Sequence, residues 1–242
     1  MNAIRQIALP FPETGLYPPS EFLESDSNEA ALAFLANIAE WPGGRLCVWG
    51  EQGCGKSHFA HVFAARTGGM VLPASELTRD KAALTAPAIA IDDADTATDA
   101  RALLHLLNLA QEEQRPVLLL ARTPPAAWDF SLPDLVSRLR AMLAVQIKAP
   151  DDELLAALLR LLAAQRQILI DEAVRDWLLT QLPREGGALR TAILRLDRAS
   201  LAARLPITMS FARKILADLL PDLLQGNDDF IIPPSQALPF LL

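Results

Sequence analysis

Cysteine is scarce in this sequence, and its scarcity excludes two classes of protein. Of the 242 residues, only Cys47 and Cys54 are cysteines. A small secreted domain stapled by disulfides needs several cysteines, and a structural zinc site needs a cluster of cysteine and histidine ligands. The positions of the two cysteines and the three histidines suggest neither arrangement.

Long hydrophobic runs are also missing. No apolar run approaches the ~18 residues that a bilayer-spanning helix requires. The N-terminal residues MNAIRQIALPFP lack the apolar core and the small-residue cleavage site of a signal peptide. These absences predict a cytoplasmic protein that does not use the membrane as a partner.

Positive charge is in short supply as well. Lys and Arg number 22 against 29 Asp and Glu, which leaves a formal net charge of −7. A protein that holds nucleic acid by phosphate contacts concentrates basic residues, because each contact releases a counterion. The acidic balance argues against a free-standing, sequence-specific DNA binder, so any contact with DNA is expected to be indirect.

Three glycines, by contrast, lie close together in one short segment that matches a known binding pattern. Residues 50–57 read Gly-Glu-Gln-Gly-Cys-Gly-Lys-Ser and match the phosphate-binding pattern G-x-x-x-x-G-K-[ST]. Gly50, Gly53 and Gly55 allow successive backbone N–H groups to turn inward around an anion. Cys54 is either a small residue that the loop tolerates or a thiol made redox-sensitive by the following helix N-terminus.

The end of this loop and its flanks fit the same chemistry. Lys56 supplies a positive charge for the β- and γ-phosphates, and the Ser57 hydroxyl can bind Mg²⁺. Arg45–Trp49 reads as a short buried strand, and Lys56–Thr67 as a helix whose positive N-terminal end faces the phosphates. These flanks argue against the alternative of a glycine turn that binds nothing.

Another predicted strand is followed directly by two acidic residues. Residues 88–91 form an apolar run that is followed by Asp92 and Asp93, and Asp92 comes 36 positions after Lys56. In phosphate-loop enzymes such a strand lies beside the loop, and its first acid holds the Mg²⁺ hydration shell. The second acid can polarise the attacking water. The same pattern also describes any strand that reaches a surface, but the upstream loop favours the functional interpretation.

Predicted strands and helices alternate along the first part of the chain, up to residue 150, and only helices are predicted after it. This change in pattern predicts two domains. We expect an extended arm (1–24), a three-layer αβα domain with a five-stranded parallel sheet (25–150), a small all-α lid (151–220) and a Pro-rich tail (221–242). The expected strands are Arg45–Trp49, Met70–Leu72, Ala88–Ile91, Val117–Ala121 and Leu143–Lys148. The expected helices are Glu29–Glu40, Lys56–Thr67, Thr96–Gln114 and Pro133–Ala141, and residues 151–167, 171–182, 188–205 and 210–220 in the lid.

Four segments resemble the DnaA/Hda branch of AAA+ proteins. Segment 50–61 (GEQGCGKSHFAH) is similar to the branch's phosphate loop, and segment 121–139 (ARTPPAAWDFSLPDLVSRL) to its Thr-Pro-Pro turn and Leu-Pro-Asp-Leu-x-Ser-Arg-Leu box. Residues 184–200 resemble the end of the lid, and residues 22–28 (FLESDSN) the segment that wraps the adenine. The resemblance implies an AAA+ fold that binds ADP or ATP with Mg²⁺.

The resemblance also implies roles for individual residues. Phe22 and Leu23 would lie at the adenine, while Cys54 and His58 would belong to the nucleotide-binding loop and its first helical turn. Arg138 matches the family's arginine finger, which reaches across a subunit interface to the γ-phosphate held by a neighbour. The alternative for Arg138 is a solvated helix charge.

Two positions depart from the family pattern. Where the family carries an acidic residue at the end of the fourth strand, this chain has Arg122. Where the lid should offer a sensing arginine, the match places Gly187, and Arg184 or Arg190 could substitute. Both departures fit a protein that binds nucleotide and acts on the ATP of a partner.

The N-terminal peptide carries a second motif. Gln6, Leu9 and Phe11 fit Q-x-x-L-x-F, which resembles the peptide by which replication proteins dock on the DNA sliding clamp. Such an extended peptide places Leu and Phe in an apolar pocket while Gln fixes the register. Gln236–Phe240 is a looser copy, either a second clamp contact or an apolar tail that folds back on the protein.

Together these resemblances imply a negative regulator of replication initiation, with the DnaA initiator and the sliding clamp as partners. The chain ends after the lid without a helix-turn-helix domain, which favours the shorter members of the branch. Two alternatives stay open: an autonomous AAA+ ATPase that remodels or loads a replication component, and a nucleotide-bound adaptor without a catalytic role. Formation of a homodimer is also left open.

Overall fold

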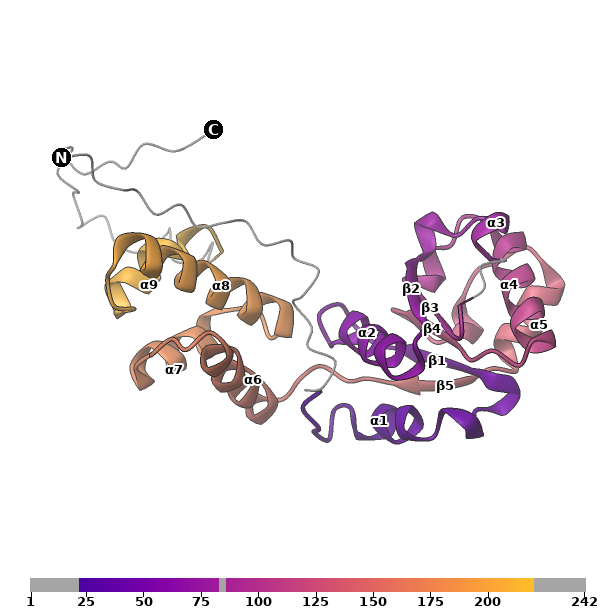
Figure 1. The fold of residues 1–242 in the computed structure, drawn as a ribbon, viewed down its shortest axis with the longest axis horizontal. Helices are drawn as coiled ribbons and strands as arrows, with labels where there is room; N and C mark the ends of the chain where they lie inside the picture. The colour runs from indigo at the N-terminus through magenta and orange to yellow at the C-terminus, as the bar shows by residue number, and fades with distance from the viewer. Residues whose placement is uncertain (1–21, 83–85, 220–242) are drawn as a thin grey trace.

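The computed structural model describes residues 22–82 and 86–219. They form an α/β unit and a helical unit, joined by the chain that follows the last strand (Figure 1). The peptide with Gln6, Leu9 and Phe11 and the segment Gln236–Phe240 lie outside the described residues.

The α/β unit is built on a single parallel sheet, as expected from the sequence. Its strands are β1 (Arg45–Trp49), β2 (Met70–Pro73), β3 (Ile89–Asp92), β4 (Val117–Ala121) and β5 (Leu143–Gln146). They are arranged in the order β2-β3-β4-β1-β5, and each pair of neighbours is parallel. Strand β4 therefore lies between β1 and β3.

Helices cover both faces of this sheet and complete a three-layer αβα unit (Figure 1). They are α1 (Glu29–Ala36), α2 (Lys56–Thr67), α3 (Arg79–Ala82), α4 (Ala100–Glu112) and α5 (Pro133–Arg140). Side chains of α1 and α2 pack in the core on one face, and those of α4 and α5 pack in the core on the other. The predicted fold class is confirmed.

The central strand β4 shows why both faces are covered. Leu118 and Leu120 belong to the core beneath α1 and α2, whereas Val117 and Leu119 belong to the core beneath α4 and α5. Successive side chains of a strand point to opposite faces. An unbroken apolar run such as this one stays out of water only when helices lie on both sides.

Several helices differ from the sequence prediction at their ends, and the largest shifts in the α/β unit are at the start of α4 and the end of α1. Helix α4 begins at Ala100 rather than Thr96, because the Asp99 side chain caps it by accepting a backbone N–H at 2.9 Å. Helix α1 ends at Ala36 rather than Glu40, and a separate 3₁₀ turn follows it. The short helix α3 was not expected.

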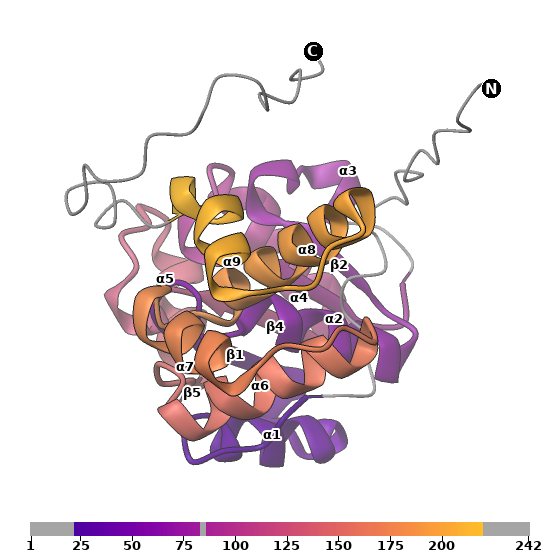
Figure 2. The ribbon, with the colours of Figure 1, turned by 90° about the vertical axis from the view of Figure 1, so that its left-hand side faces the viewer.

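The helical unit has a core of its own. Its helices are α6 (Asp152–Gln165), α7 (Glu172–Gln181), α8 (Gly186–Ala203) and α9 (Met209–Ile215). Buried residues from all four helices form this core, among them Leu159, Leu178, Ile193 and Ala212. Figure 2 looks onto the unit with the sheet behind it. Within the described part of the chain, no helix combines the length and apolar character needed to cross a bilayer.

Truncation in the central strand should destabilise the protein strongly. Leu119 is fully buried in β4, so Leu119→Ala leaves a cavity that typically lowers the free energy of unfolding by about 2–5 kcal/mol. Leu201→Ala is the control, because Leu201 is 70% exposed on the helical unit, and it should change that free energy by less than about 0.5 kcal/mol. Urea unfolding followed by circular dichroism measures both, and equal effects would contradict this assignment of the core.

Candidate nucleotide site

A cavity of about 320 Å³ lies between the α/β unit and the helical unit. The cavity walls come from the chain ahead of α1, the loop before α2, the ends of β3 and β4, and helices α6 and α8. Parallel sheets bind ligands outside the carboxyl ends of their strands, and ligand pockets measure roughly 300–1,000 Å³.

The phosphate loop follows a path that requires glycine. Gly53 and Gly55 have φ angles of +78° and +106°, in the left-handed region that strains other residues. Gly50 is needed for a different reason, because a Cβ there would lie 2.2 Å from the carbonyl oxygen of Ile147. Gly53 and Gly55 line the cavity, whereas Gly50 seats the loop against the chain that continues β5.

Lys56 is buried, although lysine is normally exposed. Its side chain lines the cavity and the residue is 8% exposed. The Nζ atom donates to the carbonyl oxygens of Gly50 and Glu51 at 2.8 and 2.7 Å, so the loop backbone holds the ammonium group. A hydrogen-bonded ammonium inside this loop suits the β- and γ-phosphates of a nucleotide.

Ser57 and Asp92 meet at the start of α2. Ser57 Oγ donates to Asp92 Oδ2 at 2.7 Å. Hydroxyl and carboxylate oxygens are hard ligands of the kind that Mg²⁺ prefers, so this pair fits the predicted ion. Asp93 also lines the cavity and is exposed. Asp92 reaches the loop although β4 separates β3 from β1, because α2 packs across the sheet onto β3.

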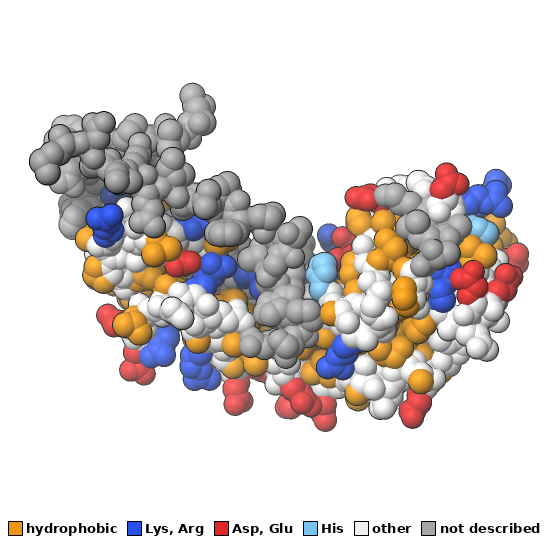
Figure 3. All heavy atoms as spheres, viewed as in Figure 1, with side chains coloured by type: hydrophobic (Ala, Val, Ile, Leu, Met, Phe, Trp, Pro, Cys, Tyr) orange, Lys and Arg blue, Asp and Glu red, His pale blue; other side chains and the backbone are white. Residues whose placement is uncertain are grey.

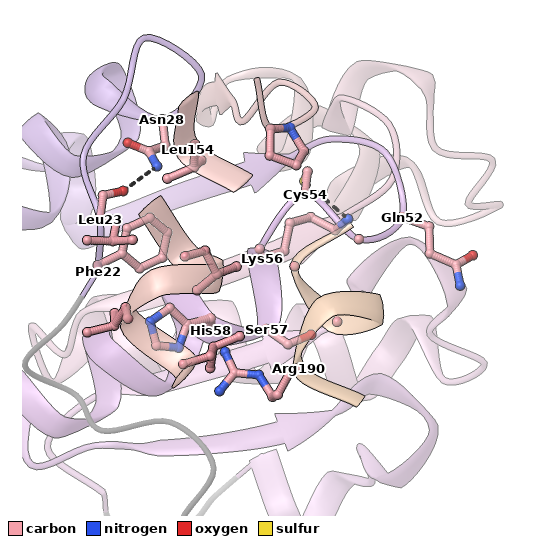
Figure 4. Close-up of a pocket in the computed structure, with 18 of the residues that line it drawn as sticks. Phe22, Leu23, Asn28, Gln52, Cys54, Lys56, Ser57, His58, Leu154 and Arg190 are labelled. Carbon is pink, nitrogen blue, oxygen red and sulfur yellow. Dashed lines mark hydrogen bonds between the residues drawn. The ribbon is translucent and has the colours of Figure 1, made fainter. Parts of the chain in front are cut away.

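Phe22 and Leu23 lie at the side of the cavity nearest α1 (Figure 4). The Phe22 ring stacks on the His58 ring with centroids 5.0 Å apart and meets the Phe59 ring edge-on at 5.9 Å. Asn28 holds this segment in place, since its Nδ2 donates to the carbonyl oxygen of Leu23 at 2.9 Å. The same side chain makes no hydrogen bond that caps α1.

The arginines near the lid occupy different environments. Arg122 and Arg190 line the cavity. Figure 4 shows Arg190 extending from α8 toward the start of α2. Arg184, by contrast, is not part of the cavity wall, and its Nη2 pairs with Asp152 Oδ1 at 2.6 Å. Of the two substitutes for a lid arginine, the geometry favours Arg190.

The helical unit touches the phosphate loop through Glu185. A Cβ built on Gly53 would lie 2.3 Å from the Glu185 Cγ atom, so the two residues pack closely. Gly187 lines the cavity two residues later. The Glu185 contact was not predicted, because nothing in the local sequence pattern pairs a loop residue with a lid residue more than a hundred positions away.

The surroundings of Cys54 disfavour its thiolate form. Burial raises the pKa of the Cys54 thiol above its usual value, against the lowering influence of nearby Lys56. The thiolate is the reactive form of cysteine, so a raised pKa disfavours redox sensitivity. Of the two interpretations left open by the sequence, a small residue tolerated in the loop is the one that this environment favours.

Arg138 lies away from the cavity. It sits in the last turn of α5 and donates from Nη1 to Gln111 Oε1 at 2.9 Å. Gln111 belongs to the last turn of α4, and both helices lead directly into strands. The pair therefore lies at the edge where the strands begin, whereas the cavity lies where β3 and β4 end. The structure does not bring Arg138 to this cavity.

The helical unit matches a known family. Residues 151–216 match the family described as "Hda, lid domain". The match begins at Asp151, whose side chain caps α6 by accepting from the backbone N–H of Leu154 at 2.7 Å, and it runs through α9. The helical unit is therefore similar to the lid domain of Hda.

The whole fold is similar to solved structures of DnaA and RuvB. Domain III of the Thermotoga maritima replication initiation protein DnaA superposes with a TM-score of 0.69 at 18% identity, over 82% of this chain and 95% of that chain. AMPPCP-bound DnaA from Aquifex aeolicus gives 0.60 at 16% identity, over 74% and 64%. A Thermotoga maritima RuvB variant gives 0.64 at 17% identity, over 84% and 73%. The predicted AAA+ fold is confirmed.

Loss of Arg190 should weaken nucleotide binding more than loss of Arg184. Arg190→Ala removes a positive charge from the cavity wall, and losing one charge-assisted hydrogen bond corresponds to about a tenfold loss of affinity. Arg184→Ala is the matched control, because this side chain pairs with Asp152 outside the cavity. Calorimetric titration with ADP and ATP measures both affinities, and equal values for the two variants would contradict the place given to Arg190.

Proposed function

We propose that this chain, an Hda-like, DnaA-related AAA+ protein, is a negative regulator of chromosomal replication initiation. In this proposal it binds an adenine nucleotide in its own cavity and promotes hydrolysis of ATP bound to DnaA through Arg138. The observation that carries the proposal is the position of Arg138 outside the chain's own cavity. A cation placed there is not positioned to act on a nucleotide in this chain's own cavity, so its target would be a nucleotide held by another molecule.

The separation of the two sites supports action in trans. Arg45 is the first residue of β1, and Trp49, directly before the phosphate loop, is the last. At about 3.3 Å per residue, this strand separates the two edges of the sheet by about 13 Å. An arginine finger must contact the terminal phosphate to stabilise the charge of the transition state. Arg138, at the far edge, is therefore suited to a neighbour's nucleotide.

The cavity residues support retention of a nucleotide rather than its rapid turnover. Lys56, Ser57 and Asp92 suit a polyphosphate with Mg²⁺, and the ion would neutralise charge on the phosphates. Arg122 adds a positive charge where the family resemblance expects a carboxylate. We propose ADP or ATP as the resident nucleotide, and a similar DnaA structure described as AMPPCP-bound supports an adenine nucleotide.

The second partner that we propose is the DNA sliding clamp. The basis is the N-terminal peptide, in which Gln6, Leu9 and Phe11 fit the docking pattern. Docking on the clamp would bring this chain to replicated DNA without a DNA-binding surface of its own. On the face in Figure 3, the described Lys and Arg side chains are interspersed with Asp and Glu, which fits such indirect recruitment in the cytoplasm.

Removal of Arg138 should abolish stimulated hydrolysis. Fingers supplied in trans contribute about 10³–10⁵-fold to the hydrolysis rate, so Arg138→Ala should return DnaA to its own slow rate. Arg140→Ala is the matched control, because Arg140 is exposed two residues further along the same helix. The measurement is single-turnover hydrolysis of ATP preloaded on DnaA, with DNA-loaded clamp present.

Two results would exclude the proposal. One is undiminished stimulation by Arg138→Ala, which would leave a tethering adaptor. The other is rapid steady-state hydrolysis by the purified chain alone, lost in Lys56→Ala, which would identify an autonomous ATPase.

The clamp contact is tested separately. Leu9→Ala combined with Phe11→Ala empties the apolar anchors of the peptide and should lower affinity for the clamp by about 1,000-fold, because buried anchors cost about 2 kcal/mol each when truncated. Nucleotide affinity should not change. Surface plasmon resonance on immobilised clamp measures the effect, and wild-type binding by this double variant would remove the clamp from the proposal.

A further inference from the structure

Two arginines converge on one neutral oxygen atom at the edge of the sheet where the strands begin. Arg138 Nη1 donates to Gln111 Oε1 at 2.9 Å, and Arg45 Nη2 donates to the same oxygen at 3.3 Å. Gln111 is exposed and the two arginines are half-buried, so the cluster reaches solvent. We name Arg45, Gln111 and Arg138 the arginine pair site.

This site carries two positive charges without a carboxylate to balance them. In residues 22–82 and 86–219, neither Arg45 nor Arg138 forms an ion pair. Burial, and after it the charge of Arg138, lowers the pKa of Arg45. Four other arginines among the described residues do form ion pairs with acidic side chains, namely Arg115, Arg166, Arg184 and Arg195. Like charges this close repel one another, and an anion bound between them relieves the repulsion.

Three rigid elements position the arginine pair site. Arg45 opens β1, Gln111 lies in the last turn of α4, and Arg138 lies in the last turn of α5. Gly43 leaves room for the arrangement, because a Cβ there would lie 3.0 Å from Arg45 Nη2. The guanidinium groups are thus held by the sheet and its helices rather than by a loop.

We infer that Arg45 is a second arginine that contacts the terminal phosphate of the neighbour's nucleoside triphosphate together with Arg138, and that Gln111 is the residue that positions both. The inference rests on the proposed function of Arg138 and names two further residues of the same site. Guanidinium groups present planar forks of donors that match phosphate oxygens. Two of them offer enough donors to engage more than one oxygen of the terminal phosphate.

The neutrality of Gln111 is part of this arrangement. A carboxylate at this position would form ion pairs with both arginines and compete with the incoming phosphate, because it carries a negative charge that an amide lacks. An amide oxygen orients the two guanidinium groups without cancelling their charge. It also releases them more easily when the phosphate arrives.

The first test removes the second charge. Arg45→Gln should lower the maximal rate of stimulated hydrolysis of DnaA-bound ATP by about 10- to 100-fold, with little change in the concentration that gives half-maximal stimulation. Arg45→Lys, which keeps the charge but not the fork, should recover part of the rate. Arg140→Gln is the control with an arginine of the same helix end that does not contact Gln111. Thermal unfolding checks that each variant is folded.

The second test converts the acceptor into an acid. Gln111→Glu should raise the melting temperature, because it pairs with two uncompensated cations, and should lower the maximal stimulated rate at the same time. A residue with only a structural role would not raise stability while reducing activity. A Gln111→Glu variant that stimulates DnaA as well as the wild type overturns the positioning role.

The outcomes separate this inference from the proposed function. If Arg138→Ala stimulates hydrolysis normally, the proposed function fails and the inference fails with it. If Arg138→Ala is inactive while folded Arg45→Gln keeps the wild-type maximal rate, the inference alone is overturned. Loss of rate in both, with partial recovery in Arg45→Lys, supports it.

Discussion

The common direction of the five strands is the constraint on which the rest of this structure depends. A parallel sheet has two chemically different edges, because every strand begins at one and ends at the other. The phosphate loop and the acids of β3 follow strand ends, and they line the cavity with the lid. Arg45 and Arg138 belong to the opposite edge. One fold therefore holds a nucleotide-sized cavity and presents cations elsewhere.

Close backbone packing gives the cavity its shape. Gly50 lies against the carbonyl of Ile147, and Gly53 lies against Glu185 of the lid, at separations that no side chain would tolerate. These contacts join the loop to the sheet on one side and to the helical unit on the other. Because the loop backbone holds the Lys56 ammonium group, the charge that would meet a phosphate is oriented by the fold itself.

Local pattern predicted the elements whose cause is local. The strands Arg45–Trp49 and Val117–Ala121 and the helix Lys56–Thr67 have the boundaries expected from apolar runs and glycine punctuation. The start of α4 was misplaced because Asp99, rather than a residue before Thr96, caps the helix. The insertion of β4 between β1 and β3 has no local signal, since strand order depends on how crossover helices pack.

The sequence by itself determined that the chain has a glycine loop that matches the phosphate-binding pattern, an acid-terminated strand, an α/β unit and a helical unit, because spacing and periodicity can be read along the chain. Tertiary structure alone decided which distant residues share a site. It placed Arg190 rather than Arg184 in the cavity wall, stacked Phe22 on His58, and joined Arg45 to Arg138 through Gln111. Contacts between residues that are far apart in the sequence cannot be read from either local segment, because they depend on how the strands and helices pack against one another.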